Sequence, residues 1–188
     1  MAAHGFKPLR HLSGGQIRTN EYSIAIDYAT AIYTGDPVKF VAAGTIELAA
    51  AGNVILGVFQ GVSYAKSDGE VVFTKYWPGA VTGATDVVAL VIDDPMVAYS
   101  VFDDGDSDYL TLADQGGCAN HVAGTGSTVT GLSGDMLDTS DASNSVAGFK
   151  ILRVVKRPGN AYGSANGDQV EVEVSVNEPF LAHHTAGI

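Results

Sequence analysis

The segment Gln169-Val170-Glu171-Val172-Glu173-Val174-Ser175-Val176 alternates strictly between apolar and polar side chains. A period of two is that of a β-strand, whose successive side chains point to opposite faces. The four valines therefore lie on one face of the expected strand, and the two glutamates and Ser175 lie on the other.

Strand patterns recur along the chain, and turn residues separate them. Residues 22–27 alternate in the same way, and residues 54–59 form the continuous apolar run of a strand buried on both faces. Turns are indicated at Trp77-Pro78-Gly79 and Pro158-Gly159-Asn160, and no amphipathic helix of ordinary length is present. We therefore expect an all-β fold, a compact β-sandwich or small β-barrel with long loops and an extended N-terminal arm. The expected core residues are Ile24, Ile26, Val38, Val54, Leu56, Val58, Val72, Leu90, Ile92, Ile151, Val154, Val172 and Val174.

The composition agrees with a folded domain that has little charge. Of 188 residues, 46% are hydrophobic, 16% are charged and 23 are glycine. Soluble domains carry about 25% charged residues, so the charged fraction is low. Few charges and many glycines are typical of short strands joined by tight turns, and of surfaces that other subunits cover.

Two regions depart from the regular strand pattern. Residues 1–20 contain Lys7, Arg10 and Arg18 before the first acidic residue, and we interpret them as a basic N-terminal arm. Residues 21–188 form the expected β domain. Within it, residues at about 103–144 are rich in Gly, Ser, Thr and Asp, which indicates an acidic, loop-rich insert.

The negative charge is concentrated in the middle of the chain. Residues 76–149 contain eleven Asp and no Lys, Arg or Glu, so they carry a net charge of −11, equal to that of the whole chain. Such a region repels phosphates and anionic lipid surfaces, so we expect neither nucleic acid nor a membrane as a partner. The single cysteine, Cys118, excludes an intrachain disulfide.

No motif in the sequence matches a known catalytic arrangement. Cys118 precedes His121 by three residues, but the base of a cysteine enzyme is usually distant in sequence, so a packed thiol is the simpler interpretation. No histidine pair has zincin spacing, and we expect His183 and His184 to be solvated or at a subunit contact. The glycine-rich residues 124–128 lack the lysine of a phosphate-binding loop. We therefore predict that the protein is not an enzyme and needs no cofactor.

Two groups of carboxylates were considered as sites. Asp104, Asp106 and Asp108 are a weak calcium candidate, because calcium prefers clustered oxygen ligands. The glycine and the final glutamate of an EF-hand are missing, so a surface turn is the simpler interpretation. Asp93 and Asp94 are adjacent and would point to opposite faces of a strand, so they cannot flank one glycosidic bond.

Several blocks of sequence together resemble a known family. They are Tyr33-Thr34-Gly35-Asp36-Pro37-Val38, Gly57-Val58-Phe59-Gln60-Gly61-Val62, Lys75-Tyr76-Trp77-Pro78-Gly79, Ala89-Leu90-Val91-Ile92-Asp93-Asp94-Pro95, Ile151-Leu152-Arg153-Val154-Val155 and Pro158-Gly159-Asn160. The chain resembles virion structural proteins of tailed bacteriophages, particularly marine phages, and residues 22–95 are similar to capsid cement (decoration) proteins. The matching motifs are turns and strands, not catalytic signatures.

The resemblance implies a protein of the outer capsid surface that is made in the host cytoplasm. It would bind the major capsid protein and further copies of itself, as a trimer, and would stabilise contacts between capsomers. Many symmetry-related weak contacts give such an assembly a large total stability. The arm would contribute to these contacts through its basic and apolar side chains, which are Phe6, Lys7, Leu9, Arg10, Leu12, Ile17 and Arg18.

Two alternative functions remain open from the sequence. The first is another part of the virion, a tail or head-tail connector protein, which would form a ring in solution. The second is a carbohydrate-binding β-sandwich in which Trp77, Tyr76 and Tyr64 stack on sugars. The Trp-Pro-Gly sequence more often anchors a turn into a core, which weighs against this second alternative.

Overall fold

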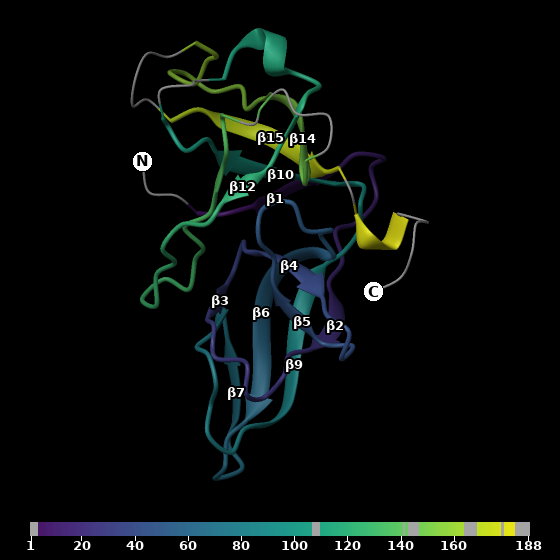
Figure 1. The fold of residues 1–188 in the computed structure, drawn as a ribbon, viewed down its shortest axis with the longest axis vertical. Helices are drawn as coiled ribbons and strands as arrows, with labels where there is room; N and C mark the ends of the chain where they lie inside the picture. Colours follow the sequence, from purple (N-terminus) through teal and green to yellow (C-terminus); the bar gives the residue numbers. More distant parts are fainter. Residues whose placement is uncertain are drawn as a thin grey trace.

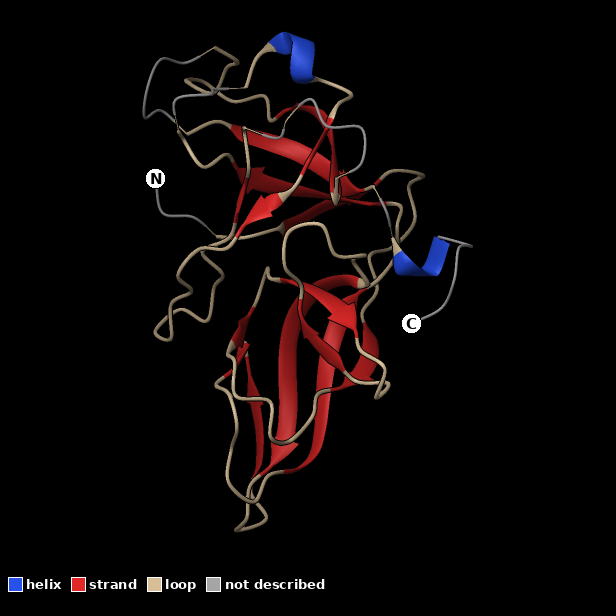
Figure 2. Ribbon diagram, in the orientation of Figure 1, coloured by secondary structure: helices blue, strands red, loops and turns tan. Residues whose placement is uncertain are grey.

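A computed structural model describes residues 4–106, 110–140, 142, 147–163, 169–177 and 179–182 of the chain. Strands account for 45% and helices for 3% of the structure. The all-β fold expected from the alternating patterns is therefore confirmed, and strands dominate both halves of the molecule (Figure 2).

The first of two large sheets joins the N-terminal strand to the strands at the end of the chain. Its order is β1-β10-β15-β14-β11, and all of its pairs are antiparallel. The strands are β1 (Lys7–His11), β10 (Val97–Phe102), β11 (Cys118–Ala119), β14 (Phe149–Val154) and β15 (Glu171–Val176). The alternating segment quoted above forms β15, which lies between β10 and β14.

The second large sheet is built from the first half of the chain. Its order is β2-β9-β6-β4-β5, and β7 also pairs with β6. The strands are β2 (Asn20–Ser23), β4 (Pro37–Phe40), β5 (Ile46–Leu48), β6 (Gly57–Ala65), β7 (Val71–Thr74) and β9 (Thr85–Ile92). The long strand β6 is central, because it pairs with β9 along one side and with β4 and β7 along the other.

Short elements complete the described structure. Two small antiparallel sheets pair β3 (Ile32–Tyr33) with β8 (Tyr76–Trp77), and β12 (His121–Val122) with β13 (Met136–Leu137). The 3₁₀ helices η1 and η2 have three residues each and span Leu112–Asp114 and Phe180–Ala182. Within the described ranges, no helix has the length and apolar character needed to cross a membrane.

The two large sheets occupy opposite ends of an elongated molecule (Figure 1). Two hydrophobic clusters are present. The first contains Phe6, Tyr99, Phe149 and the valines of β15, and it extends to Val58 and Ile92 at the ends of β6 and β9. The second lies within the half that contains the six-stranded sheet and includes Ile32, Phe59 and Trp77. The described sheets remain open, so of the two expected architectures the sandwich-like one is supported and the closed barrel is not.

Most of the expected core residues are buried, and two are exposed. Ile26 and Val54 have exposed fractions of 49% and 42%. Their strands are shorter than the pattern predicts, because β2 ends at Ser23 and Ile26 lies in a turn, while Val54 precedes β6 in a loop. Alternation fixes the face of a side chain only while the backbone stays extended, so the prediction fails where a turn begins.

The interpretation of residues 1–20 as an arm separate from the domain is wrong for its central part. Strand β1 pairs with β10, with Lys7 opposite Ser100 and His11 opposite Val97. Phe6 has no exposed surface and stacks on Phe149 at a ring centroid distance of 4.0 Å. The N-terminal segment is therefore an edge strand of the five-stranded sheet, and Phe6 is not available to a partner.

The burial of Phe6 predicts a large effect of its truncation. We expect Phe6→Ala to lower the free energy of unfolding by about 3–5 kcal/mol, because it leaves a cavity against Phe149. Leu9→Ala, three residues further along in β1 and 45% exposed, should cost less than about 1 kcal/mol. Urea denaturation measures both values, and equal small costs would show that β1 is a loosely attached arm after all.

Candidate functional site

The turn Thr34-Gly35-Asp36 lies where the two large sheets meet. Gly35 accepts a hydrogen bond from Phe6 N and donates one to Phe59 O, both at 2.9 Å. Thr34 donates its backbone N–H toward Lys75 O and Gly131 O, and its carbonyl accepts from Ser133 N at 2.9 Å. The turn therefore connects β1, β6, the segment before β8 and the loop before β13.

Two glycines allow the close approach of these segments. Gly5 and Gly35 have φ angles of +64° and +99°, in the left-handed region that side chains disfavour. A Cβ atom on Gly5 would lie 2.4 Å from the Cβ of Ser133, and one on Gly35 would lie 2.9 Å from His4 O. Any larger residue at either position would push the N-terminal segment away from the turn.

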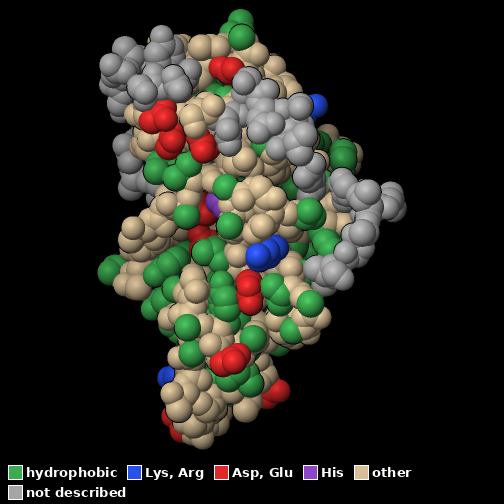
Figure 3. Space-filling view, viewed as in Figure 1, with side chains coloured by type: hydrophobic (Ala, Val, Ile, Leu, Met, Phe, Trp, Pro, Cys, Tyr) green, Lys and Arg blue, Asp and Glu red, His purple; other side chains and the backbone are tan. Residues whose placement is uncertain are grey.

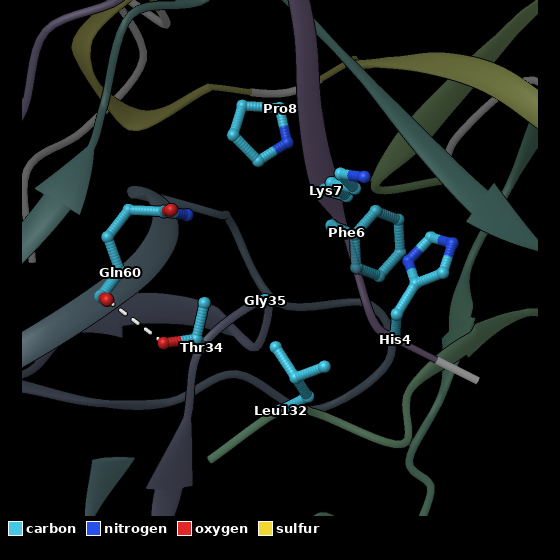
Figure 4. Close-up of a pocket in the computed structure, with 8 residues that line it drawn as sticks. All are labelled: His4, Phe6, Lys7, Pro8, Thr34, Gly35, Gln60 and Leu132. Atoms are coloured by element: carbon cyan, nitrogen blue, oxygen red, sulfur yellow. Dashed lines mark hydrogen bonds between the residues drawn. The ribbon is translucent and has the colours of Figure 1, made fainter. Parts of the chain in front are cut away.

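A groove opens beside this turn (Figure 4). Its volume is about 370 Å³, and its lining consists of His4, Phe6, Lys7, Pro8, Thr34, Gly35, Gln60 and Leu132. In Figure 4, Gln60 and Thr34 lie on one side, Lys7 and Pro8 on the other, and Leu132 below them. The groove can hold a small apolar group with a polar end near Lys7 or Gln60.

A buried polar cluster lies at the same junction. It consists of Asp36, Ser133, Asp135 and His121, whose exposed fractions are 4%, 1%, 4% and 3%. Ser133 accepts a hydrogen bond from Asp135 N at 2.9 Å through Oγ, and its side chain is also hydrogen-bonded to Asp36. The imidazole Nε2 of His121 lies 4.0 Å from Asp135 Oδ2. Segments far apart in the sequence thus place two carboxyls and an imidazole in one interior site.

Backbone groups hold the members of this cluster in position. Asp36 Oδ2 accepts from Tyr33 N at 2.7 Å, which closes the turn locally. Asp135 Oδ1 accepts from Gly124 N at 2.9 Å. The Nε2 atom of His121 lies 3.1 Å from Ala49 O, as expected if this nitrogen carries the proton. The cluster is therefore part of the framework of the junction.

Burial shifts the pKa values of Asp36, Asp135 and His121. Desolvation, followed by the charge of Asp135, raises the pKa of Asp36 to about 7. Desolvation raises the pKa of Asp135 to about 6, against the hydrogen bond from Gly124 N. Desolvation lowers the pKa of His121, against its contact with Ala49 O. The two carboxyls thus titrate near neutral pH, where the imidazole is uncharged.

The polar face of β15 is also buried, and arginines neutralise it. Glu173 is 1% exposed; Arg10 Nε donates to its Oε1 at 2.6 Å and Arg153 Nε to its Oε2 at 2.7 Å. Glu171 pairs with Arg157 Nη1 at 2.7 Å. The glutamates that alternate with valine are therefore enclosed by arginines from β1, from β14 and from the segment after β14.

The remaining arm residues are distributed over the surface. Leu9 and Ile17 are exposed by 45% and 37%, Lys7 and Arg18 are exposed, and Leu12 is half-buried. Arg10 is engaged with Glu173 inside the chain. The residues expected to bind a partner therefore do not form one continuous arm, and their role toward a partner remains a prediction.

The structure brings two of the three calcium candidates together. Asp104 Oδ1 and Asp106 Oδ1 lie 2.8 Å and 2.7 Å from Thr139 Oγ1, while Asp108 lies outside the described residues. No group of three or more His, Cys, Asp or Glu side chains suited to a metal occurs in the described part of the chain.

The other considered motifs serve structural contacts. Asp93 accepts from Asn20 and Tyr22, whereas Asp94 pairs with His11 Nε2 at 3.0 Å. The two neighbouring carboxylates thus have separate partners.

Cys118 and His121 are both buried, on β11 and β12, and His121 directs Nε2 to Ala49. The backbone of Gly124, in the glycine-rich stretch, binds the carboxylate of Asp135 in the chain itself. His183 and His184 lie outside the described residues.

The aromatic residues suggested for sugar binding are largely enclosed. Trp77 has no exposed surface, and its Nε1 donates to Tyr28 O at 3.0 Å. Tyr64 is 6% exposed and packs edge-on against Trp77, while Tyr76 stacks on Tyr33. Trp77 therefore anchors a turn in the core, and the carbohydrate-binding alternative loses its main stacking surface.

Comparison of the chain with protein-family models, with curated proteins and with solved structures gave no significant match. Arguments about function therefore rest on the sequence and on the geometry described above.

Sequence reasoning did not identify the polar cluster. The sequence patterns include Asp36 only in a block that resembles cement proteins and His121 only as a possible base for Cys118, and they assign no role to Ser133 or Asp135. The local Gly-Asp-Pro sequence signals the turn, but no local pattern indicates that Asp135 lies beside it. The burial of Glu173 was also missed, because an alternating strand normally exposes its polar face.

The arginine contacts to Glu173 predict a specific effect on stability. Arg10→Ala should lower the free energy of unfolding by about 1.5–3 kcal/mol, because the buried carboxylate loses charge-assisted hydrogen bonds. Lys7→Ala, an exposed position on the same strand, should change it by about 0.5 kcal/mol or less. Thermal and urea unfolding of both variants test this, and equal effects would exclude a stabilising role for the Arg10–Glu173 pair.

Proposed function

We propose that this chain is a non-enzymatic structural protein of a tailed-phage virion, a decoration protein that binds the outer capsid surface and joins neighbouring capsomers. The turn-and-strand blocks that resemble cement proteins suggest the family. An all-β, sandwich-like fold with several open strands is suited to this function, because sheet edges can pair with other subunits.

The observation that carries the proposal is the apolar edge strand β7. It pairs with β6 on one side, and the described strands include no partner for its other side. Val71 and Phe73 project from β7 with exposed fractions of 74% and 68%. An exposed apolar edge promotes association, and soluble monomers usually protect such edges with charges, proline or a bulge.

The sequence around β7 provides little such protection. Glu70 and Lys75 flank the strand, but Val71-Val72-Phe73-Thr74 itself is uncharged. Glu70 is already paired with Lys66 at 2.6 Å. A subunit or capsid surface that covers β7 would bury Val71 and Phe73 and use the unpaired backbone groups of the edge. Such a contact is suited to the bridging function of a cement protein.

The charge distribution is compatible with contact through β7, because this strand is uncharged. On the face shown in Figure 3, acidic side chains lie over both halves of the molecule, and one group of them lies over the half that contains the five-stranded sheet. Like charges on neighbouring copies repel, so close contact is favoured through surfaces with less charge. Strand β7 lies in the opposite half of the molecule (Figure 1).

A binding experiment with capsids tests the proposal. Purified protein would be mixed with particles of the source phage that lack it, and co-sedimentation would give the affinity. We expect Phe73→Lys to weaken binding about tenfold or more, because it places a charge in an apolar contact. Val129→Lys changes a residue that is 94% exposed in a turn outside the sheets, and it should bind as the unmodified protein does.

The outcomes separate the alternatives. Equal binding by both variants, with unchanged circular dichroism, would exclude β7 as the docking edge. If the unmodified protein does not bind capsids at all, the decoration function is refuted. Attachment to tails or to the portal end, together with a ring in solution, would support the connector alternative in its place.

A further inference from the structure

We propose that Asp36, Asp135 and His121 form a proton-controlled lock between the two large sheets, closed when the carboxyls are protonated and loosened when they ionise. This inference is independent of the proposed function. The members of the buried cluster come from the turn at Asp36 and from the β12–β13 region, which are hydrogen-bonded to each other at the junction through Thr34 and Ser133.

The geometry places the lock behind the groove. Asp36 belongs to the turn whose residues Thr34 and Gly35 line the groove, and Asp135 follows the loop residue Leu132, which lines it as well. Phe6 lines the groove and packs edge-on against His121 at a centroid distance of 6.4 Å. Separation of Asp36 from Asp135 would therefore move Leu132 away from Thr34, which adjoins it in the lining of the groove.

The groups facing each carboxyl do not include a lysine or arginine. Asp36 faces Asp135, Ser133 and Tyr33 N. Asp135 also faces Gly124 N and, at 4.0 Å, His121 Nε2. Within the described residues, neither carboxyl has an ion pair with a permanent cation, in contrast to Glu173 with Arg10 and Arg153.

Since no described lysine or arginine compensates the charge of Asp36 or Asp135, ionisation of these carboxyls destabilises the closed junction. The folded-state pKa values of Asp36 and Asp135, about 7 and about 6, exceed the ordinary value of 3.8. The stability that they contribute is therefore fully present below pH 3.8 and is lost as the pH rises through these folded-state values. About one pH unit above the folded-state pKa of Asp36 both carboxyls are almost fully ionised even in the closed state, and a further rise in pH changes the opening equilibrium little through them.

His121 acts in the opposite direction. Its pKa is lowered from 6.5 by burial, so the neutral imidazole favours the closed junction. That contribution is present above pH 6.5 and is lost as the pH falls through the lowered value. Between pH 5.5 and pH 7.5, however, two carboxyls oppose one imidazole. The net expectation is an opening equilibrium on the order of tenfold more favourable at pH 7.5.

Hydrogen exchange of the full chain measures this opening directly. Protection factors, corrected for the intrinsic pH dependence of exchange, would be compared at pH 5.5 and 7.5 for peptides from residues 31–37 and 120–137. We expect about tenfold lower protection at pH 7.5 in these junction peptides. Peptides from β9, which lies outside the junction, should change much less.

Substitutions test whether the carboxyls cause this change. Asp36→Asn and Asp135→Asn each keep an oxygen for the bonds from Tyr33 N and Gly124 N but cannot ionise. Each should restore much of the lost protection at pH 7.5 and flatten the pH dependence. Asp103→Asn is the matched control, because Asp103 is 1% exposed, also has a raised pKa of about 6 and directly follows β10. Since Asp103 bridges to Leu137, this control is compared on the peptides from residues 31–37.

The result that supports the lock is a flattened pH response of the junction peptides in Asp36→Asn, and not in Asp103→Asn. If Asp36→Asn does not fold, Asp135→Asn answers the same question. An unchanged pH response in both junction variants, or an equal flattening by Asp103→Asn, would overturn the proposal. Protection that is already independent of pH in the unmodified protein would also overturn it.

Discussion

Three consecutive residues, Thr34, Gly35 and Asp36, hold hydrogen bonds to segments from four distant parts of the chain. The backbone of this turn joins Phe6, Phe59, Lys75 and Ser133. The hydrophobic cluster of the five-stranded sheet also contains Val58 of β6 and Ile92 of β9, so apolar packing contributes to the contact between the two sheets. The polar turn between them provides directional contacts that apolar packing does not, because hydrogen bonds require defined distances and angles.

The buried carboxylates of this protein have two different electrostatic environments. Glu173 lies in the middle of the five-stranded sheet, where Arg153 binds it from the adjacent strand β14 and Arg10 binds it from β1, beyond β10. Its charge is compensated at any pH at which arginine is protonated, so this contact fixes the sheet permanently. Among the described residues, no lysine or arginine forms an ion pair with Asp36 or Asp135, and burial raises their pKa values toward neutrality. The same residue chemistry thus produces a constant contact in one place and a titratable contact in the other.

Charged and apolar surface segments are also separated along the chain. The acidic stretch that begins near β8 contains most of the residues of the loop-rich region, whereas the edge strand β7 is short, uncharged and apolar. Contact through β7 would leave the half with the five-stranded sheet exposed to solvent (Figure 1). The proposed role as a subunit of a larger assembly depends on this separation, because charge keeps free copies soluble while the edge remains available for pairing.

The sequence by itself determined the all-β fold, the position of most strands and the anchoring of Trp77 in a turn, because these depend on local periodicity and on turn residues. The tertiary structure alone decided that Phe6 belongs to the core, that Glu173 is buried and that Asp36 lies beside Asp135. Phe6 precedes a short edge strand whose pattern is not regular, so its burial depends on pairing with β10. Glu173 is covered by arginines from two other strands, and Asp135 reaches Asp36 only after distant segments have packed together. Local patterns specify which face a residue occupies, but the partner that covers this face is fixed only when the sheets assemble.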